Sequence, residues 1–216
     1  AMEYVCMAVL MLNNRVPEMV TSQREGQWIQ RFNDDVVGKT LLVLGVGHVG
    51  RSVAGWAKSL GMHVIGIRRS AKPRRHVDEM YPPEALHSIL PRVDFVLVTV
   101  PLTDSTYHLI GEDELNLLKP GAGIINYSRA RIVDYDALLK KLERREMSAI
   151  LDVFDPEPIP KDSPLWHAPN LIITPHSSSD DTHLYTTKTL DVVFANLERL
   201  MDGQPLINKV SRRRQY

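Results

Sequence analysis

Short apolar runs alternate along this chain with stretches in which apolar residues recur every three or four positions. Six aliphatic, largely β-branched runs predict strands, at residues 41–44, 63–67, 95–100, 123–126, 149–153 and 171–174. Helical or helix-like segments are predicted between and after them, at residues 49–60, 84–90, 112–118, 136–145 and 180–201. Such alternation is typical of a parallel sheet covered on both faces. The pattern therefore predicts an α/β fold, a doubly wound parallel sheet of the Rossmann type.

The two ends of the chain depart from this alternation. Residues 2–15 predict a helix with little polar surface, interrupted at Val16 and Pro17, and residues 18–31 form a less regular arm with Trp28. A helix that is apolar nearly all round needs a cover, from its own domain or from a second subunit. The arm packs on a partner or folds back on its own domain, and the sequence leaves both open. We divide the chain into a helix and dimerisation arm, a Rossmann domain and a tail, at residues 1–35, 36–204 and 205–216.

The strand at residues 41–44 runs directly into a glycine-rich turn, Gly45-Val-Gly47-His-Val-Gly50. A buried strand followed by this G-x-G-x-x-G spacing is typical of a dinucleotide-binding crossover. Gly45 permits the tight turn, Gly47 lets the backbone approach a pyrophosphate, and Gly50 lets the next helix pack closely on the strand. Unpaired amides at that helix start face the phosphates. A turn of no function is the alternative, but the amphipathic helix that follows favours cofactor binding.

Composition and charge exclude several classes of partner for this protein. The 216 residues include 26 basic and 26 acidic side chains, so no excess charge attracts nucleic acid or an anionic membrane. The single cysteine, Cys6, has no partner for an internal disulfide, which suits a reducing compartment. No apolar run approaches the roughly 20 residues of a membrane span, and no signal peptide is evident. We expect a cytoplasmic protein with no bound metal.

The end of the second predicted strand bears on the choice of nucleotide. A site for NAD usually places an acidic residue there, where it bonds the ribose hydroxyls. This strand instead ends in Arg68, Arg69 and Ser70. Guanidinium groups and a hydroxyl bind a 2′-phosphate, which a carboxylate would repel. An exposed basic loop is the simpler interpretation, but we favour NADP(H) over NAD(H), with NAD(H) as the alternative.

Three polar residues follow the predicted strands at the edge of the sheet where ligands of doubly wound folds bind. Arg129 follows the fourth strand, Glu157 the fifth, and His176 the sixth. Each has an ordinary explanation, as a surface cation, a solvated loop acid or a residue before the last helix. Together, at corresponding strand ends, they predict a reactive site.

Several segments resemble the signature of the D-isomer-specific 2-hydroxyacid dehydrogenases. They are residues 118–129, 132–134 with 137–138, 151–158, 163–166, 170–176 and 100–103, together with the glycine turn, and cover nearly the whole chain. The family includes glyoxylate/hydroxypyruvate reductases and phosphoglycerate dehydrogenases.

The resemblance implies roles for individual residues. Arg129 would hold the carboxylate and carbonyl of a 2-keto acid, and His176 would be the general acid/base paired with Glu157. A carboxylate beside a histidine favours the charged imidazole, so a proton donor is kept near neutrality. The resemblance also implies that Asp152 contacts the nicotinamide carboxamide. Further cofactor contacts are implied for His48, Val49, Pro101, Thr106, Tyr127, Ser128, Ser178 and Ser179.

The sequence departs from the family pattern at three places. Ala130 replaces the usual glycine after the arginine, which adds strain of about 1 kcal/mol if this residue has a positive φ. Residues 177–179 are all serine, which makes the loop after His176 more polar than usual. Family members also carry a second domain before the helix with which this chain begins. Because that domain closes the cleft, we expect this chain alone to bind NADPH but to turn over slowly or not at all.

The resulting hypothesis is NADPH-dependent reduction of a small 2-keto acid to a D-2-hydroxy acid by a homodimer. The sequence does not identify which keto acid is reduced. A non-catalytic NAD(P)-binding module, similar to the transcriptional corepressors of the same family, is the alternative, but it has no need for Arg129, Glu157 and His176 together. A third alternative is formate oxidation. A site for that reaction would resemble this one with glutamine in place of the glutamate beside the histidine, and Glu157 speaks against it.

Overall fold

The computed structural model describes residues 2–178, 185–213 and 215, which fall into two compact units divided after Ser178. The first unit contains a seven-stranded sheet in the order β3-β2-β1-β4-β5-β6-β7, and every neighbouring pair is parallel. The strands are β1 Thr40–Leu44, β2 His63–Ile67, β3 Glu79–Tyr81, β4 Phe95–Val98, β5 Gly123–Asn126, β6 Ser148–Leu151 and β7 Leu171–Ile173. The predicted doubly wound Rossmann fold is confirmed.

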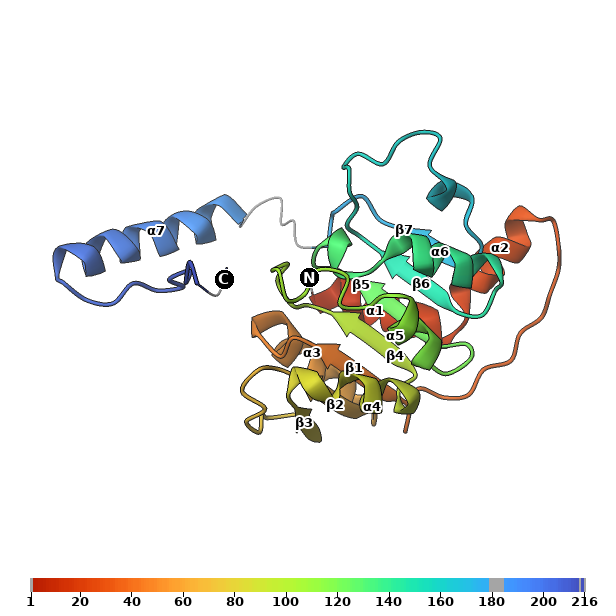
Figure 1. Ribbon diagram of the computed structural model, residues 1–216, viewed down its shortest axis with the longest axis horizontal. Coiled ribbons are helices and arrows are strands. Elements are labelled where there is room, and N and C mark those ends of the chain that lie inside the picture. The colour runs from red at the N-terminus through yellow and green to blue at the C-terminus, as the bar shows by residue number, and fades with distance from the viewer. Residues whose placement is uncertain (1, 179–184, 214, 216) are drawn as a thin grey trace. The chain divides into compact units, whose positions relative to one another are not determined.

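Helices cover both faces of this sheet (Figure 1). They are α1 Met2–Asn13, α2 Val16–Arg24, α3 His48–Ser59, α4 Leu86–Ile89, α5 Glu112–Leu117 and α6 Tyr135–Glu143. Because strand side chains alternate between faces, Leu41 and Val43 of β1 pack with α1 and α3, whereas Leu42 and Leu44 pack on the opposite face. That second face is covered by α4, α5 and α6. The alternating apolar runs of the sequence thus form two cores, one on each face.

The structure corrects the predicted number of strands from six to seven. Strand β3 was missed because its three residues are only half buried and form no apolar run. It pairs with β2 alone, with Tyr81 beside Ile67, and forms one edge of the sheet. The predicted helix at residues 84–90 is also shorter, because α4 has four residues between two 3₁₀ turns.

The N-terminal region is more regular than predicted. The interruption at Val16 and Pro17 is the start of α2, where a proline has no hydrogen bond to lose. Helix α1 is covered by its own domain, since Val5, Ala8 and Val9 are fully buried between the sheet and α3. Residues 1–35 therefore do not form a separate unit. Residues 25–36, which follow α2, belong to no helix or strand.

The second unit contains α7, Tyr185–Met201, and the segment after it. The boundary after Ser178 differs from the predicted division at residue 204, and the predicted helix start at residue 180 lies outside the described residues. Asn196 exchanges two hydrogen bonds with the backbone of Ile207, at 3.1 and 2.7 Å, and Arg199 Nε donates to Pro205 O at 2.6 Å. The segment after α7 therefore folds back along the helix.

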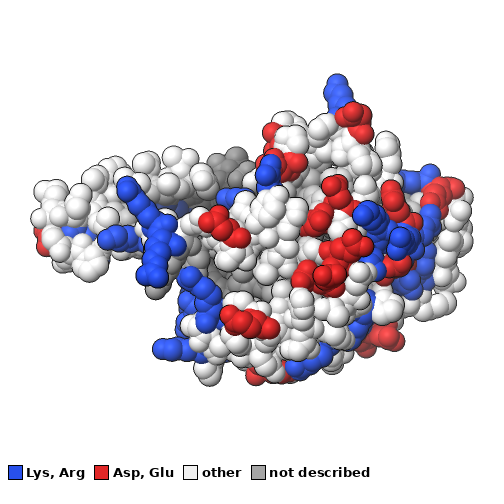
Figure 2. Space-filling model, viewed as in Figure 1, with Lys and Arg blue, Asp and Glu red and all other residues white. Residues whose placement is uncertain are grey.

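The distribution of surface charge agrees with the equal numbers of acidic and basic residues in the sequence. Acidic and basic side chains lie interspersed over the face seen in Figure 2, with no extended field of one sign. In the part of the chain that the structure describes, no helix combines the length and the apolar character needed to cross a membrane.

Candidate active site

The glycine turn between β1 and α3 has two glycines that the protein's own packing requires. Gly45 has φ +101°, and a Cβ there would lie 2.7 Å from the backbone nitrogen of Val100. A Cβ on Gly50 would lie 2.4 Å from the carbonyl oxygen of Gly45. A larger residue at position 45 would push the turn away from the chain after β4, and one at position 50 would force the turn and the start of α3 apart.

Gly47, in contrast, faces open space. It is exposed, and a Cβ there would meet no atom of the chain within 4 Å. Gly47 is also the N-cap of the twelve-residue helix α3, and no side chain caps that helix. The first-turn amides, which begin at His48 and Val49, therefore have no side-chain acceptor and suit an anionic group. An uncapped helix start beside an open approach at Gly47 fits the pyrophosphate of a dinucleotide.

The loop after β2 is strongly basic. Five of the ten residues from 68 to 77 are Arg or Lys, and none is acidic. The backbone amide of Arg68 donates to Tyr81 O at 3.0 Å, so the missed strand β3 fixes where this loop leaves the sheet. Arg69 and Ser70 are exposed in the turn that follows. The loop therefore offers cations and a hydroxyl, but no carboxylate, at the end of β2.

Two residues with predicted cofactor contacts use their hydroxyls inside the protein. Thr106 Oγ1 donates to the carbonyl of Pro101 at 2.7 Å and accepts from the Thr103 amide at 2.8 Å, which closes the loop after β4. Ser128 Oγ donates to the carbonyl of Val100, which joins the loops after β4 and β5. Pro101 is exposed at the start of its loop. The structure therefore gives Thr106 and Ser128 loop-fixing roles, and their cofactor contacts stay predictions.

A buried asparagine shapes the turn that presents Arg129. The side chain of Asn126, fully buried at the end of β5, donates to Arg129 O at 3.0 Å and to Tyr135 Oη at 3.1 Å. Its Oδ1 accepts from the Ser128 amide at 3.2 Å. Tyr135 Oη in turn donates to Val153 O at 2.8 Å, beyond the end of β6. This network holds the exposed Arg129 at the carboxyl edge of the sheet.

The strain considered for Ala130 does not arise. This residue begins a 3₁₀ turn and is absent from the described non-glycine residues with positive φ. An alanine therefore fits the position without the left-handed backbone that favours glycine.

His176 and Glu157 form the predicted pair. His176 Nδ1 lies 2.7 Å from Glu157 Oε2, and Glu157 Oε1 accepts from the Phe154 amide at 2.7 Å. Burial raises the pKa of Glu157, but the His176 and Phe154 hydrogen bonds and the charges of His176 and Arg129 together lower it below its ordinary value. The three predicted catalytic residues therefore share one electrostatic environment.

Asp152 binds the loop that carries His176. Its carboxylate is fully buried and accepts from Thr174 Oγ1, from the Ser177 amide at 2.9 Å and from the Ser178 amide at 3.0 Å. Within this loop His176 has φ +51°, a left-handed conformation that is uncommon for residues other than glycine. Asp152 bonds the chain on both sides of His176 and so fixes this turn. Its predicted contact with a nicotinamide carboxamide stays a prediction.

Two further predicted contacts have their own surroundings in the protein. Tyr127 packs edge-on against Tyr4 of α1, with ring centroids 6.2 Å apart, and its buried hydroxyl has no partner in the described part of the chain. Burial raises the pKa of this phenol, and the charge of Asp152 adds to the effect. Ser178 is buried beside Asp152, whereas Ser179 lies outside the described residues. Across residues 2–178, 185–213 and 215, no three His, Cys, Asp or Glu side chains are placed to hold a metal.

The glycine turn and the Arg129, Glu157 and His176 cluster thus lie at the carboxyl ends of strands of one sheet. The profile of the family described as "D-isomer specific 2-hydroxyacid dehydrogenase, NAD binding domain" matches residues 6–178. The chain belongs to this family. Members of the D-isomer specific 2-hydroxyacid dehydrogenase family are oxidoreductases, so this chain belongs to a family of enzymes.

Named relatives agree with this assignment. A glyoxylate reductase of Korarchaeum cryptofilum is 37% identical over 200 residues, which are 88% of this chain and 59% of that protein. A glyoxylate/hydroxypyruvate reductase B of Yersinia enterocolitica is 34% identical over 179 residues, 79% of this chain and 55% of that protein. The chain thus spans between half and two thirds of these relatives.

A solved structure gives the same result for the fold. The D-isomer specific 2-hydroxyacid dehydrogenase of Xanthobacter autotrophicus, in complex with NADPH and MES, matches with a TM-score of 0.90 and 32% identity. The match covers 100% of this chain and 88% of that chain.

Proposed function

We propose that this chain is the cofactor-binding part of an NADPH-dependent reductase that converts a small 2-keto acid into a D-2-hydroxy acid. The observation that carries the proposal is the His176–Glu157 hydrogen bond of 2.7 Å, at the same edge of the sheet as Arg129 and the glycine turn. The reductase names of the relatives support the substrate class. With a single cysteine, we place the protein in the reducing cytoplasm.

The three catalytic residues account for the proton and for the position of the substrate. NADPH supplies a hydride to the keto carbon when it is bound. His176 Nδ1 is committed to Glu157, so the proton reaches the carbonyl oxygen from Nε2. Arg129 binds the substrate carboxylate, because a planar guanidinium makes two parallel hydrogen bonds. One hydride and one proton thus turn the ketone into the alcohol.

The choice of NADPH rests on the basic loop after β2. A 2′-phosphate carries charge that the Arg68, Arg69 and Ser70 turn can bind, while NADH finds no carboxylate there for its ribose. The Xanthobacter autotrophicus structure, which contains NADPH, supports the same cofactor. The dinucleotide would extend from this loop past Gly47 to the edge that carries His176.

The experiment follows both binding and product. The chain is mixed with NADPH and hydroxypyruvate, cofactor binding is measured by calorimetry, and the product is resolved by chiral chromatography. Because the relatives are longer than this chain, we expect clear binding and slow formation of D-glycerate. The variant His176→Gln should bind NADPH normally and lose the product. Equal product from this variant, or an L-product, would contradict the proposed chemistry.

We also propose that two copies of the chain associate through α1 and residues 25–36. Trp28 is 99% exposed and Ile29 44%, and on α1 the side chains of Met7 and Leu10 are 40% and 39% exposed. Large exposed apolar side chains of this kind mark interaction surfaces, and tryptophan contributes strongly to them. Light scattering should therefore show a dimer, and Trp28→Ala should weaken it. A monomer at high protein concentration would contradict this assembly.

A further inference from the structure

A second pocket lies at the opposite edge of the sheet from the candidate active site. It has a volume of about 340 Å³ and is bordered by the first residues of β4, β5 and β6, namely Phe95, Gly123 and Ser148. The end of α1 and residues 32–34 complete its wall. Amino ends of parallel strands lie on the side away from the glycine turn. This pocket is therefore separate from the cofactor cleft.

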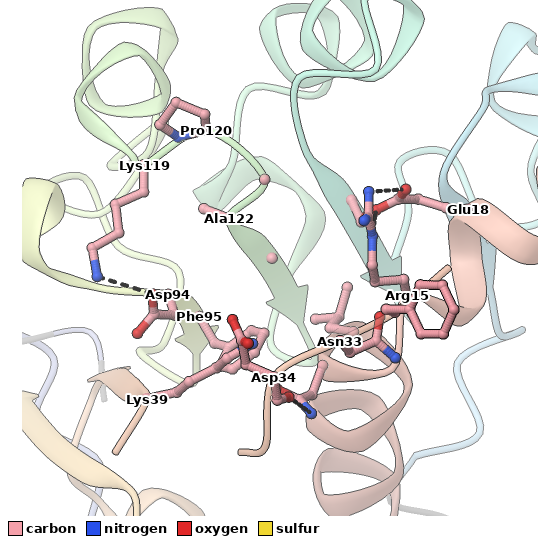
Figure 3. Close-up of a pocket in the computed structure, with 16 residues that line it drawn as sticks. Arg15, Glu18, Asn33, Asp34, Lys39, Asp94, Phe95, Lys119, Pro120 and Ala122 are labelled. Atoms are coloured by element: carbon pink, nitrogen blue, oxygen red, sulfur yellow. Dashed lines mark hydrogen bonds and ion pairs between the residues drawn. The ribbon is translucent and has the colours of Figure 1, made fainter. Parts of the chain in front are cut away.

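Most of the charges around this pocket are neutralised within the protein. Lys119 Nζ lies 2.9 Å from Asp94 Oδ1, and Arg15 makes two bonds to Glu18, at 2.9 and 2.6 Å. Figure 3 shows these two pairs on different sides of the pocket. Lys119 and Asp94 neutralise one another, whereas Glu18 also pairs with Arg31 at 3.0 Å and is therefore shared by two guanidinium groups. All of these groups are engaged within the protein, so they frame the site.

Two charges of opposite sign remain. Lys39 lies over the ring of Phe95, 5.9 Å from its centroid, and has no carboxylate partner among the described residues. The Asp34 carboxylate has no cation partner in the same part of the chain. Both line the pocket, and in Figure 3 they lie between the two neutralised pairs. The pocket thus offers one cation and one anion to a ligand.

Ser148 adds an independent polar group. Its residue is only 6% exposed, it lines the pocket at the start of β6, and its hydroxyl has no hydrogen-bond partner in the described structure. A hydroxyl on a pocket wall that makes no bond within the protein can bond water or a ligand there. The apolar side chains of Leu12, Phe32 and Phe95 line the remaining space.

We propose that this pocket binds a free α-amino acid. Its carboxylate would pair with Lys39, its ammonium group with Asp34, and Ser148 would donate or accept a hydrogen bond inside the pocket. The apolar residues would contact the side chain of the amino acid. A zwitterion satisfies both remaining charges at once, whereas a simple acid or amine leaves one of them unpaired. The proposal does not depend on the reaction at His176.

The test uses three compounds that differ only in their charged groups. L-phenylalanine, 3-phenylpropionate and 2-phenylethylamine are titrated into the intact chain by calorimetry, without cofactor. We expect L-phenylalanine to bind at least about tenfold more tightly than either analogue, because each analogue lacks one charge-assisted bond. Equal affinities for all three compounds, or no binding of L-phenylalanine, would overturn the proposal. Failure here leaves NADPH binding unaffected, so the two proposals are separable.

Matched variants locate the binding. Asp34→Asn and Lys39→Met should each weaken L-phenylalanine binding about tenfold or more, whereas Asp35→Asn and Lys161→Met, both at exposed positions outside the pocket, should not. Ser148→Ala should weaken binding without lowering the melting temperature of the ligand-free chain, since no protein bond is lost. Binding that all these variants leave unchanged would place the amino acid elsewhere and refute the assignment. If instead Asp34→Asn and Lys39→Met change only the dimerisation constant, a second copy occupies the pocket and the proposal is wrong.

Discussion

Two buried side chains at the carboxyl edge of the sheet each bind the loop that carries a residue proposed to be catalytic. Asn126 bonds the turn of Arg129, and Asp152 bonds Thr174, Ser177 and Ser178 around His176. Both are fully buried, so their hydrogen bonds carry the full cost of any unpaired group. The positions of the Arg129 and His176 loops therefore depend on these two buried residues.

Replacing Asp152 by asparagine should disturb His176 more than the rest of the fold. The Asp152 carboxylate accepts hydrogen bonds from the backbone amides of Ser177 and Ser178. The NH₂ group of an asparagine is a donor and cannot accept from them, so one or two hydrogen bonds are lost. We expect a loss of about 1–3 kcal/mol in the free energy of unfolding. The NMR signals of the His176 imidazole should shift at the same time. The control is Asp155→Asn, an exposed acid paired with Arg131, and an unchanged His176 signal in Asp152→Asn would contradict the positioning role.

Replacing Arg129 by lysine tests its proposed role as a carboxylate anchor. Lysine keeps the charge but loses the two-bonded fork, so turnover should fall by about 10-fold or more while NADPH affinity is kept. The exposed position of Arg129 predicts little change in the melting temperature. Steady-state kinetics and calorimetry separate the two quantities. Parallel losses of turnover and NADPH affinity would indicate a structural arginine.

At the scale of elements, two glycines of the turn from β1 to α3 have different roles: Gly50 is required for packing, and Gly47 leaves space for the proposed ligand. Gly50→Ala should lower the free energy of unfolding by about 1–3 kcal/mol, because its Cβ would meet the Gly45 carbonyl at 2.4 Å. Gly47→Ala should leave stability nearly unchanged but weaken NADPH binding, because its Cβ would enter the space open to the pyrophosphate. Urea denaturation and calorimetry of both variants check this. If Gly47→Ala binds NADPH as well as the unmodified chain, the pyrophosphate lies elsewhere.

Edge strand β3 should make part of the fold sensitive to acid. Glu79 accepts hydrogen bonds from Arg92, Tyr81 and His63, which lower its pKa from 4.5 to about 2. A carboxylate with a lowered pKa stabilises the folded state above pH 4.5, and this stabilisation is lost as the pH falls toward 2. At this partly exposed site we expect about 1 kcal/mol or less. Unfolding of Glu79→Gln should therefore differ from the unmodified chain at pH 6 and converge with it in acid.

Much of this architecture could be predicted because burial leaves a local pattern in the sequence. Strands buried on both faces appear as apolar runs, and the turn at Gly45 requires glycine at fixed spacing. Strand β3 left no such pattern because it is a short, half-exposed edge, and Pro17 concealed the start of α2. The bonds of Asn126 with Tyr135 and of Asp152 with Thr174 join residues 9 and 22 positions apart, and only the fold brings them together.

The two edges of the sheet carry two different candidate sites. The carboxyl edge carries the glycine turn and the cluster of Arg129, Glu157 and His176, whereas the amino edge carries the pocket of Lys39, Asp34 and Ser148. Strands β4, β5 and β6, which run between the two edges, are buried along their whole length. The cofactor cleft is the part on which the family membership and the proposed reaction both depend.

Calorimetric titration of the chain with NADPH and, separately, with NADH tests the proposed cofactor site most directly. The basic loop after β2 and the open approach at Gly47 predict that NADPH binds with one site per chain, at least about tenfold more tightly than NADH. Tighter binding of NADH would contradict the assignment of the 2′-phosphate site to Arg68, Arg69 and Ser70. Binding of neither nucleotide would contradict the cofactor cleft itself.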